Sequence, residues 1–214
     1  MKQIDFYFDF ISPYAYLAFE HLPEMLMGLS YSVTYKPVLF AAMLRHHGQL
    51  GPAEIQPKRD WTYRQVAWLA HTHGIEMQLP AAHPFNPLPL LRLAVASNQQ
   101  GMPNRYVTEA LFHHVWRGGA DAADAQRLQT LIAHIAPSRD MHGNEVKSQL
   151  KAHTEAAITQ ALFGVPTMVV DGKPFWGFDA LTMMRDYLRG DAWFKGQAWD
   201  AAAQAPVGAG RAKR

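Results

Sequence analysis

Ser12 is the residue of this chain best placed to bind an anion. Residues 4–10 alternate apolar and polar side chains with several aromatics, which predicts a strand. Ser12 and Pro13 follow; serine favours the position that caps a helix, and proline favours the first helical position. A hydroxyl at this point lies among free backbone N–H groups, which stabilise a negative charge such as a thiolate. The pattern predicts that Ser12 donates a hydrogen bond to a thiolate, without acting as a nucleophile itself.

The thiol of such a site has to come from another molecule, because none of the 214 residues is a cysteine. Thioredoxin-like proteins carry the first cysteine of a Cys-x-x-Cys pair at this point of a βαβ unit. Residues 12–15 of this chain read Ser-Pro-Tyr-Ala instead. The composition therefore excludes structural disulfides, thiolate metal sites and dithiol redox chemistry by the protein alone.

A second candidate site lies at Val165 and Pro166. Residues 165–170 are rich in β-branched side chains and predict a strand. An X-Pro bond that opens a strand is a candidate for a cis peptide, which would turn the N–H and C=O of Val165 outward. These groups would then be free to pair with the backbone of a short peptide. The alternative is a trans proline that simply begins an edge strand, and pairing with Ser12 in one fold favours the cis form.

A third candidate consists of Gly177, Phe178 and Asp179, directly before a predicted helix at residues 180–188. Free N–H groups at a helix start bind a carboxylate, and the Asp179 carboxylate binds an ammonium group. Both charges occur on the γ-glutamyl α-carbon of glutathione. The simpler alternative is that Asp179 only caps the helix.

These candidates require elements that bring the two ends of the chain together. The sequence predicts strands at residues 4–10, 31–39, 165–170 and 173–176, the last two joined by Asp171-Gly172, which favours a type I′ turn. It predicts helices at residues 13–27, 60–74, 88–97, 104–116, 124–136, 144–162 and 180–188, and an irregular loop with four prolines at residues 79–89.

This order of elements predicts an α/β chain with a thioredoxin-like fold, βαβ…ββα. Residues 1–39 and 164–190 would form the thioredoxin-like domain, and residues 40–163 an inserted all-helical domain. Residues 201–214 are rich in Ala, Gly, Gln and Pro and are predicted to be a disordered tail.

Charge and hydropathy narrow the range of partners. The 20 basic and 18 acidic residues are spread along the chain without a basic stripe interleaved with aromatics, so nucleic acid is not an expected partner. No apolar run approaches the ~20 residues of a membrane helix, and no secretory signal opens the chain. A cysteine-free chain of this kind fits a cytoplasmic enzyme.

The 11 histidines lack His-Glu-x-x-His spacing, so we expect no metal site.

Several segments of the chain resemble 2-hydroxychromene-2-carboxylate isomerases, which are relatives of the kappa-class glutathione transferases with a DsbA-like thioredoxin fold. The resemblance lies in residues 5–14, 35–39, 83–88, 163–167 and 176–179. It implies a cytoplasmic, homodimeric enzyme that uses glutathione. The implied contacts are Ser12 at the sulfur, Val165 and Pro166 at the cysteinyl backbone, and Trp176, Gly177, Phe178 and Asp179 at the γ-glutamyl end.

The resemblance also implies a reaction, the cis-trans isomerisation of 2-hydroxychromene-2-carboxylate to trans-o-hydroxybenzylidenepyruvate through reversible thiolate addition. By position, Lys36, Lys58 and Asn86 are candidates to bind the substrate carboxylate. Phe178 stands where the family often has a polar residue, and Leu44 and Glu54 stand where some isomerases have polar or basic residues. Two alternatives stay open: a kappa-like transferase or peroxidase acting on another electrophile, and a non-catalytic module that binds glutathione or peptides.

Overall fold

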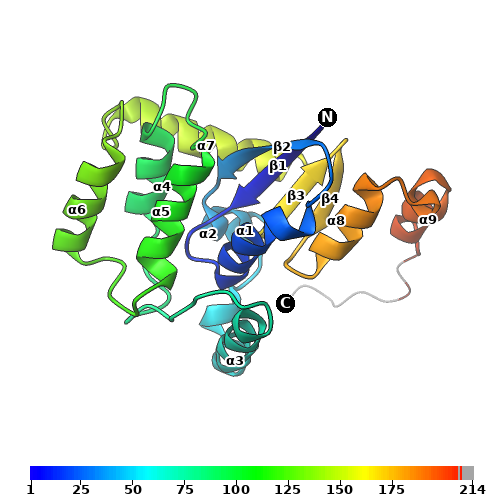
Figure 1. Cartoon of the computed structure of the whole chain (residues 1–214), viewed down its shortest axis with the longest axis horizontal. Coiled ribbons are helices and arrows are strands. Elements are labelled where there is room, and N and C mark those ends of the chain that lie inside the picture. Colours follow the sequence, from blue (N-terminus) through cyan, green and yellow to red (C-terminus); the bar gives the residue numbers. More distant parts are fainter. Residues whose placement is uncertain (207, 209–214) are drawn as a thin grey trace.

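The computed structural model describes residues 1–206 and 208. Its centre is a four-stranded sheet in the order β2-β1-β3-β4, with strands from both ends of the described chain (Figure 1). The strands are β1 (Lys2–Phe8), β2 (Tyr31–Pro37), β3 (Thr167–Val170) and β4 (Lys173–Trp176). β1 pairs in parallel with β2 and antiparallel with β3, and β3 pairs antiparallel with β4. The predicted thioredoxin-like fold is thereby confirmed.

Helices cover the sheet and extend to one side of it (Figure 1). α1 packs against α3, α5 and α8, whereas α7 packs against β2, α2 and α4. The bounds are α1 (Pro13–Met25), α2 (Phe40–His46), α3 (Gln56–Thr72), α4 (Leu88–Ala96), α5 (Arg105–Trp116), α6 (Ala125–Ile135), α7 (Asn144–Thr159), α8 (Ala180–Leu188) and α9 (Ala198–Ala203). Two short 3₁₀ helices, Pro52–Glu54 and Ala192–Lys195, precede α3 and α9.

β1 is a central strand of the sheet, and both of its faces are apolar. Phe6 and Phe8 point into the large core that also contains the apolar face of α1. Tyr7 points to the opposite face and packs with Met43 of α2 and Ala157 of α7. Helices have to cover both faces of this strand, since leaving a large apolar side chain in water costs about 1.5–3 kcal/mol.

The helical part of the chain shares its core with β1 and α1. The Phe112 ring of α5 lies 5.4 Å from the Phe8 ring and 4.9 Å from the Phe10 ring, measured between centroids. The Trp116 Nε1–H donates a hydrogen bond to the Phe10 carbonyl oxygen at 3.0 Å. α5 is thus fixed directly against the loop between β1 and α1, which carries Ser12.

The structure corrects several predicted element boundaries. α1 ends at Met25 instead of residue 27, and α7 ends at Thr159 instead of residue 162. β3 begins at Thr167 instead of residue 165, since the preceding Pro166 has no N–H for the sheet. α2 was not predicted as a separate helix, because seven residues are too few for a periodic pattern.

The prediction of a disordered tail from residue 201 is wrong for Ala201–Ala203, which belong to α9. The aromatic residues just before this Ala-rich run dock the segment on β4. The Trp199 ring lies 5.6 Å from the Phe175 ring and 5.7 Å from the Phe194 ring. Residues 207 and 209–214 of the predicted tail lie outside the described residues.

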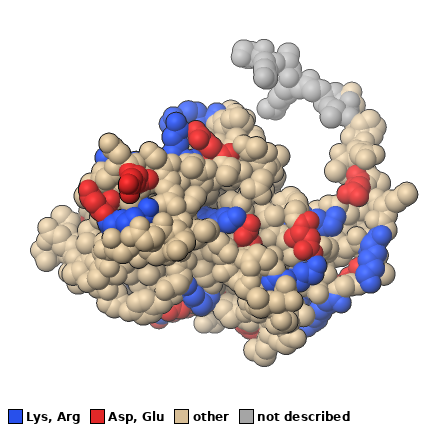
Figure 2. Space-filling view, turned by 90° about the horizontal axis from the view of Figure 1, so that it is seen from above, with Lys and Arg blue, Asp and Glu red and all other residues tan. Residues whose placement is uncertain are grey.

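Within residues 1–206, none of the helices combines the length and the apolar character that crossing a bilayer requires. On the face of the molecule shown in Figure 2, acidic and basic side chains are interspersed.

Candidate active site

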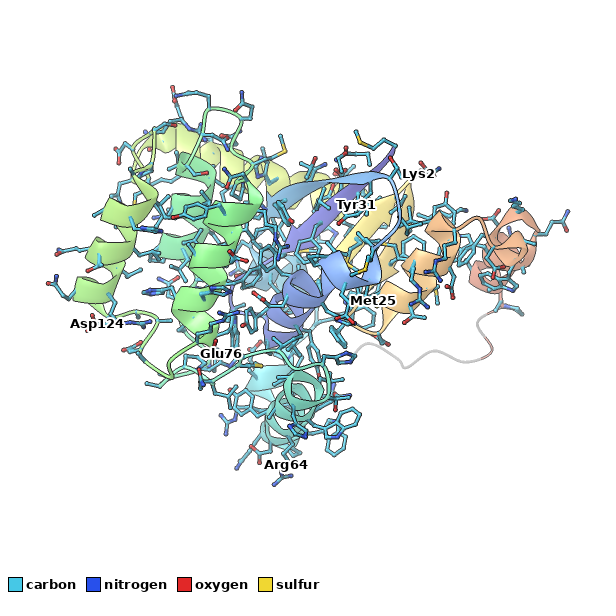
Figure 3. The ribbon with its side chains drawn as sticks, in the orientation of Figure 1. Lys2, Met25, Tyr31, Arg64, Glu76 and Asp124 are labelled. Atoms are coloured by element: carbon cyan, nitrogen blue, oxygen red, sulfur yellow. The ribbon has the colours of Figure 1, made fainter. Side chains whose placement is uncertain are left out.

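A cleft of about 1240 Å³ opens at the loop between β1 and α1. Its walls come from α2, the start of α3, the 79–87 loop, the segment before β3 and the segment after β4. In Figure 1, α3 lies below α1, and in Figure 3 Arg64 projects from α3 away from the rest of the molecule. Part of the cleft lining is apolar and aromatic, with side chains Leu44, Leu50, Trp61, Phe163 and Trp176.

Ser12 lies in the cleft at the N-terminus of α1, as predicted. Its Oγ accepts a hydrogen bond from the Ala15 N–H at 3.2 Å, so the hydroxyl caps the helix. The same Oγ lies 3.5 Å from the carbonyl oxygen of Val165. Residues that are far apart in sequence therefore meet at this helix end.

The Val165–Pro166 peptide bond is cis, as the sequence favoured, and both residues line the cleft. Among the described residues, the Val165 N–H donates no hydrogen bond to another group of the protein. The Pro166 carbonyl accepts the Gly177 N–H at 2.9 Å, which ties this segment to the end of β4. Val165 thus places its carbonyl beside Ser12 and leaves its N–H without a protein partner in the cleft wall, where an extended peptide can pair with it.

Trp176, Gly177, Phe178 and Asp179 all line the same cleft. Gly177 has φ +97°, and a Cβ at this position would lie 2.4 Å from Oδ1 of Asp179. The lack of a side chain therefore lets the Asp179 carboxylate fold back over the backbone. The Trp176 indole packs on Gly164, where a Cβ would lie 2.6 Å from Nε1.

Asp179 does not cap α8 with its side chain, which corrects the simpler alternative from the sequence. The residue has helical dihedral angles, φ −65° and ψ −24°, and its carboxylate makes no capping hydrogen bond. The exposed carboxylate faces the cleft and is available to a cation.

The three predicted carboxylate-binding residues are not brought together. Lys58 lines the cleft near the start of α3, beside Arg59. Lys36 does not line it: its Nζ lies 2.7 Å from Oδ2 of Asp5, on the sheet face that α7 covers. Asn86 uses its Oδ1 to accept the Leu88 N–H at 3.1 Å and does not line the cleft either.

Asp9 is a buried acid in the cleft wall to which the sequence analysis gave no role. Its side chain is 0% exposed, and it accepts hydrogen bonds from the N–H groups of Ile11 (3.1 Å) and Phe40 (2.9 Å). Burial raises the pKa of its carboxyl to about 7, against the opposing effect of these backbone N–H groups. The sequence feature that could have indicated a role for Asp9 is its position, near the end of a predicted strand and three residues before Ser12.

Two side-chain contacts connect α3 with the rest of the cleft, and both escaped the sequence analysis. The Tyr14 hydroxyl of α1 donates to Oε1 of Gln65 at 2.6 Å. The Tyr63 hydroxyl lies 2.7 Å from Nδ1 of His83, and Nε2 of His83 lies 2.8 Å from the Ile11 carbonyl oxygen. His83 belongs to a segment that resembles the isomerase family, but the sequence indicated no partner for it.

Leu44 and Glu54 also line the cleft, and the Glu54 carboxylate accepts the Gly51 N–H at 2.7 Å.

Outside the cleft, the side chains of Glu20, Glu109 and His113 come close together. Arg117 and Arg105 pair with the two carboxylates of this group at 3.4 and 3.7 Å. Arginine thus already supplies the positive charge there.

Comparison with known proteins agrees with this arrangement. The DSBA-like thioredoxin domain matches residues 3–189. A 2-hydroxychromene-2-carboxylate isomerase of Sphingobium xenophagum is 30% identical over 87% of this chain and 98% of its own length. Glutathione S-transferase kappa 1 of Rattus norvegicus is 26% identical over 90% of this chain and 92% of its own length.

A solved structure of a 2-hydroxychromene-2-carboxylate isomerase superposes with a TM-score of 0.75 at 22% identity, over 96% of this chain and 100% of that one. This likeness shows the fold. Together with the sequence matches, it establishes that the chain belongs to the DsbA-like thioredoxin family, in the group of the 2-hydroxychromene-2-carboxylate isomerases.

Proposed function

We propose that this protein is a glutathione-dependent cis-trans isomerase that converts 2-hydroxychromene-2-carboxylate to trans-o-hydroxybenzylidenepyruvate. The observation that carries the proposal is the meeting of the Ser12 hydroxyl, the Val165 N–H and the Asp179 carboxylate in one cleft of a chain without cysteine. Relatives at 28–30% identity bear the name of this isomerase. As part of the proposal, the enzyme works in the cytoplasm as a homodimer.

The groups in the cleft suit glutathione from one end to the other. The Ser12 hydroxyl would donate to the sulfur, next to the N–H groups at the start of α1. Val165 would pair with the cysteinyl backbone, beside Pro166. At the γ-glutamyl end, Trp176 would provide a wall, the Asp179 carboxylate would hold the ammonium group, and the backbone at Gly177 and Phe178 would face the carboxylate.

Bound glutathione would supply a thiolate able to add to a conjugated carbon of the ring-opened substrate, turning a double bond into a rotatable single bond, and its elimination would restore the double bond and the free thiol. The protein would contribute in two ways: Ser12 and the N-terminus of α1 would lower the thiol pKa, and the cleft would hold an aromatic acid nearby. The apolar wall that includes Leu44, Leu50 and Trp61 would pack on the aromatic ring. Lys58 would attract the carboxylate.

A kappa-like transferase is the second candidate, because a kappa transferase is 26% identical over 90% of this chain. The same cleft would then bring the thiolate to an electrophile that stays covalently attached to the glutathione sulfur. The two reactions differ in stoichiometry: isomerisation returns the thiol, whereas transfer consumes it.

We expect many turnovers for each glutathione, with free thiol unchanged. The test follows 2-hydroxychromene-2-carboxylate by absorbance with glutathione far below the substrate concentration, and free thiol is counted before and after. Loss of thiol in proportion to turnover would indicate the transferase. Glutathione binding without any turnover would indicate a binding module, and full activity without thiol would refute the glutathione assignment.

Replacing Lys58 should weaken the binding of the anionic substrate. Lys58→Ala is expected to raise KM by roughly two- to five-fold with little change in kcat, since an exposed charge contributes about 0.5–1 kcal/mol. The effect should shrink at high salt. Lys36→Ala is the matched control, because Lys36 pairs with Asp5 away from the cleft and its loss should leave KM unchanged. Equal KM values for the Lys58 variant and the wild type would remove Lys58 from the site.

A further inference from the structure

Two aromatic N–H groups hold the carbonyl groups that directly precede Ser12. Trp116 Nε1 of α5 lies 3.0 Å from the Phe10 carbonyl oxygen, and His83 Nε2 lies 2.8 Å from that of Ile11. A carbonyl oxygen is negatively polarised, so its direction matters to an anion bound next to it. The peptide that enters α1 is therefore oriented by groups from the helical part of the chain.

The tautomer of His83 follows from its two partners. The Ile11 carbonyl only accepts hydrogen bonds, so Nε2 carries the proton. Burial lowers the pKa of His83, opposed by its bond to Ile11, and the ring is neutral at pH 7. Nδ1 of a neutral ring accepts, and the Tyr63 hydroxyl lies 2.7 Å from Nδ1 and 3.1 Å from the His83 carbonyl oxygen, which are both acceptors for its one proton. The Ile11 carbonyl thus sets the tautomer, and the Tyr63 hydroxyl contacts His83 from the side of α3.

The imidazole is held in a rigid frame. Its centroid lies 5.5 Å from the Trp116 ring and 6.1 Å from the Phe85 ring. The segment that leads to it is fixed by Arg117, which pairs with Glu76 at 3.3 Å, and by the Gln78 N–H, which donates to the Trp116 carbonyl at 2.8 Å. Figure 3 shows Glu76 near the lower ends of α1 and α5.

We propose that His83 is a positioning residue of this site, which holds the Ile11 carbonyl and thereby orients Ser12 and the first N–H groups of α1 toward the bound sulfur. This inference rests on the proposed function, because its direct readout is the thiol of bound glutathione. His83 touches neither glutathione nor substrate in this role.

The test compares His83→Ala, His83→Gln and His114→Ala with the wild type. The pKa of the bound glutathione thiol is measured from the ultraviolet absorbance of the thiolate against pH, alongside kcat, KM and thermal stability. His83→Ala should raise the thiol pKa by about half a unit, the size of a weakened helix-terminus effect. It should lower kcat by roughly ten- to a hundred-fold, as misplacement near a reacting atom does.

His83→Gln should recover part of the change in thiol pKa and part of the loss in kcat, since the glutamine side chain is long enough for its amide N–H to reach the Ile11 carbonyl. His114→Ala is the matched control: His114 Nε2 lies 3.1 Å from the Ala122 carbonyl oxygen, and burial also lowers its pKa. It loses the same kind of bond outside the cleft, so it should change stability and leave the thiol pKa and kcat unchanged. Should His83→Ala not fold, His83→Asn replaces it, because the shorter amide does not extend to the position of Nε2.

The outcomes separate the two proposals. A wild-type protein that forms no bound thiolate would refute the proposed function. A wild-type thiolate whose pKa is unchanged in a folded His83→Ala or His83→Asn variant would refute the positioning role alone. Equal losses in His83→Ala and His83→Gln would likewise overturn it, because the hydrogen bond to Ile11 would then be irrelevant.

Discussion

Ser12→Ala should reduce turnover by roughly ten- to a thousand-fold, the scale on which an enzyme loses one donor that stabilises a developing or bound anion. The physical reason is the place of the hydroxyl, which lies in the cleft at the first turn of α1, 3.5 Å from the Val165 carbonyl. Without it, the thiol of bound glutathione should titrate at higher pH. The measurement is kcat at neutral pH, together with the thiol pKa in the complex.

The stability of this variant needs a control, because Ser12 also caps α1 through the Ala15 N–H. Losing a cap costs about 1 kcal/mol. Asn104→Ala is matched to it: the Asn104 side chain accepts the Val107 N–H at 2.9 Å, caps α5 and does not line the cleft. Both variants should lose similar stability, and only Ser12→Ala should lose turnover. Full activity of Ser12→Ala at neutral pH would contradict the role of Ser12 at the thiolate.

Asp9 should make the stability of the protein fall as the pH rises. Its pKa is about 7 in the folded state against 3.8 for the free side chain, because burial disfavours the charged form. The folded state therefore binds more protons between these two values, so the free energy of unfolding decreases with pH there. The contribution is complete below pH 3.8 and is lost as the pH passes about 7. Its size is on the order of 4 kcal/mol at 1.36 kcal/mol for each pKa unit.

Asp9→Asn isolates this contribution, because the amide stays neutral throughout. We expect the wild-type free energy of unfolding, measured with urea, to decline relative to that of the variant from about pH 4 to about pH 8. At low pH the wild type should be the more stable of the two, because the hydroxyl oxygen of its protonated carboxyl can still accept one of the N–H groups of Ile11 and Phe40, whereas an amide N–H₂ can only donate. A difference between the two proteins that is constant over this range would show that the buried carboxyl titrates normally.

Features that depend on neighbours in sequence were predictable. Ser12 and Pro13 begin α1, and Asn104 begins α5, because capping joins residues two or three positions apart. Asp171 and Gly172 both have positive φ, which a type I′ turn requires. The alternation over residues 4–10 indicated a strand there, since period two is a property of a single strand.

Partners that meet only after folding were not predictable. The sequence around Lys36 and Lys58 does not indicate what either side chain contacts, and only the fold places Lys36 on Asp5 and Lys58 at the cleft. His83 acquires its tautomer from the Ile11 carbonyl and a further contact from Tyr63, and both residues lie on other segments.

The sequence by itself therefore determined the thioredoxin-like order of elements, the absence of an internal thiol and the position of Ser12 at a helix start. These rest on local periodicity, capping and composition. The tertiary structure decided that Ser12, Val165 and Asp179 share one cleft, that Asp179 leaves α8 uncapped, and that Asp9 is a buried acid with a raised pKa. Burial and long-range hydrogen bonds decide these properties, and both depend on which distant segments pack together.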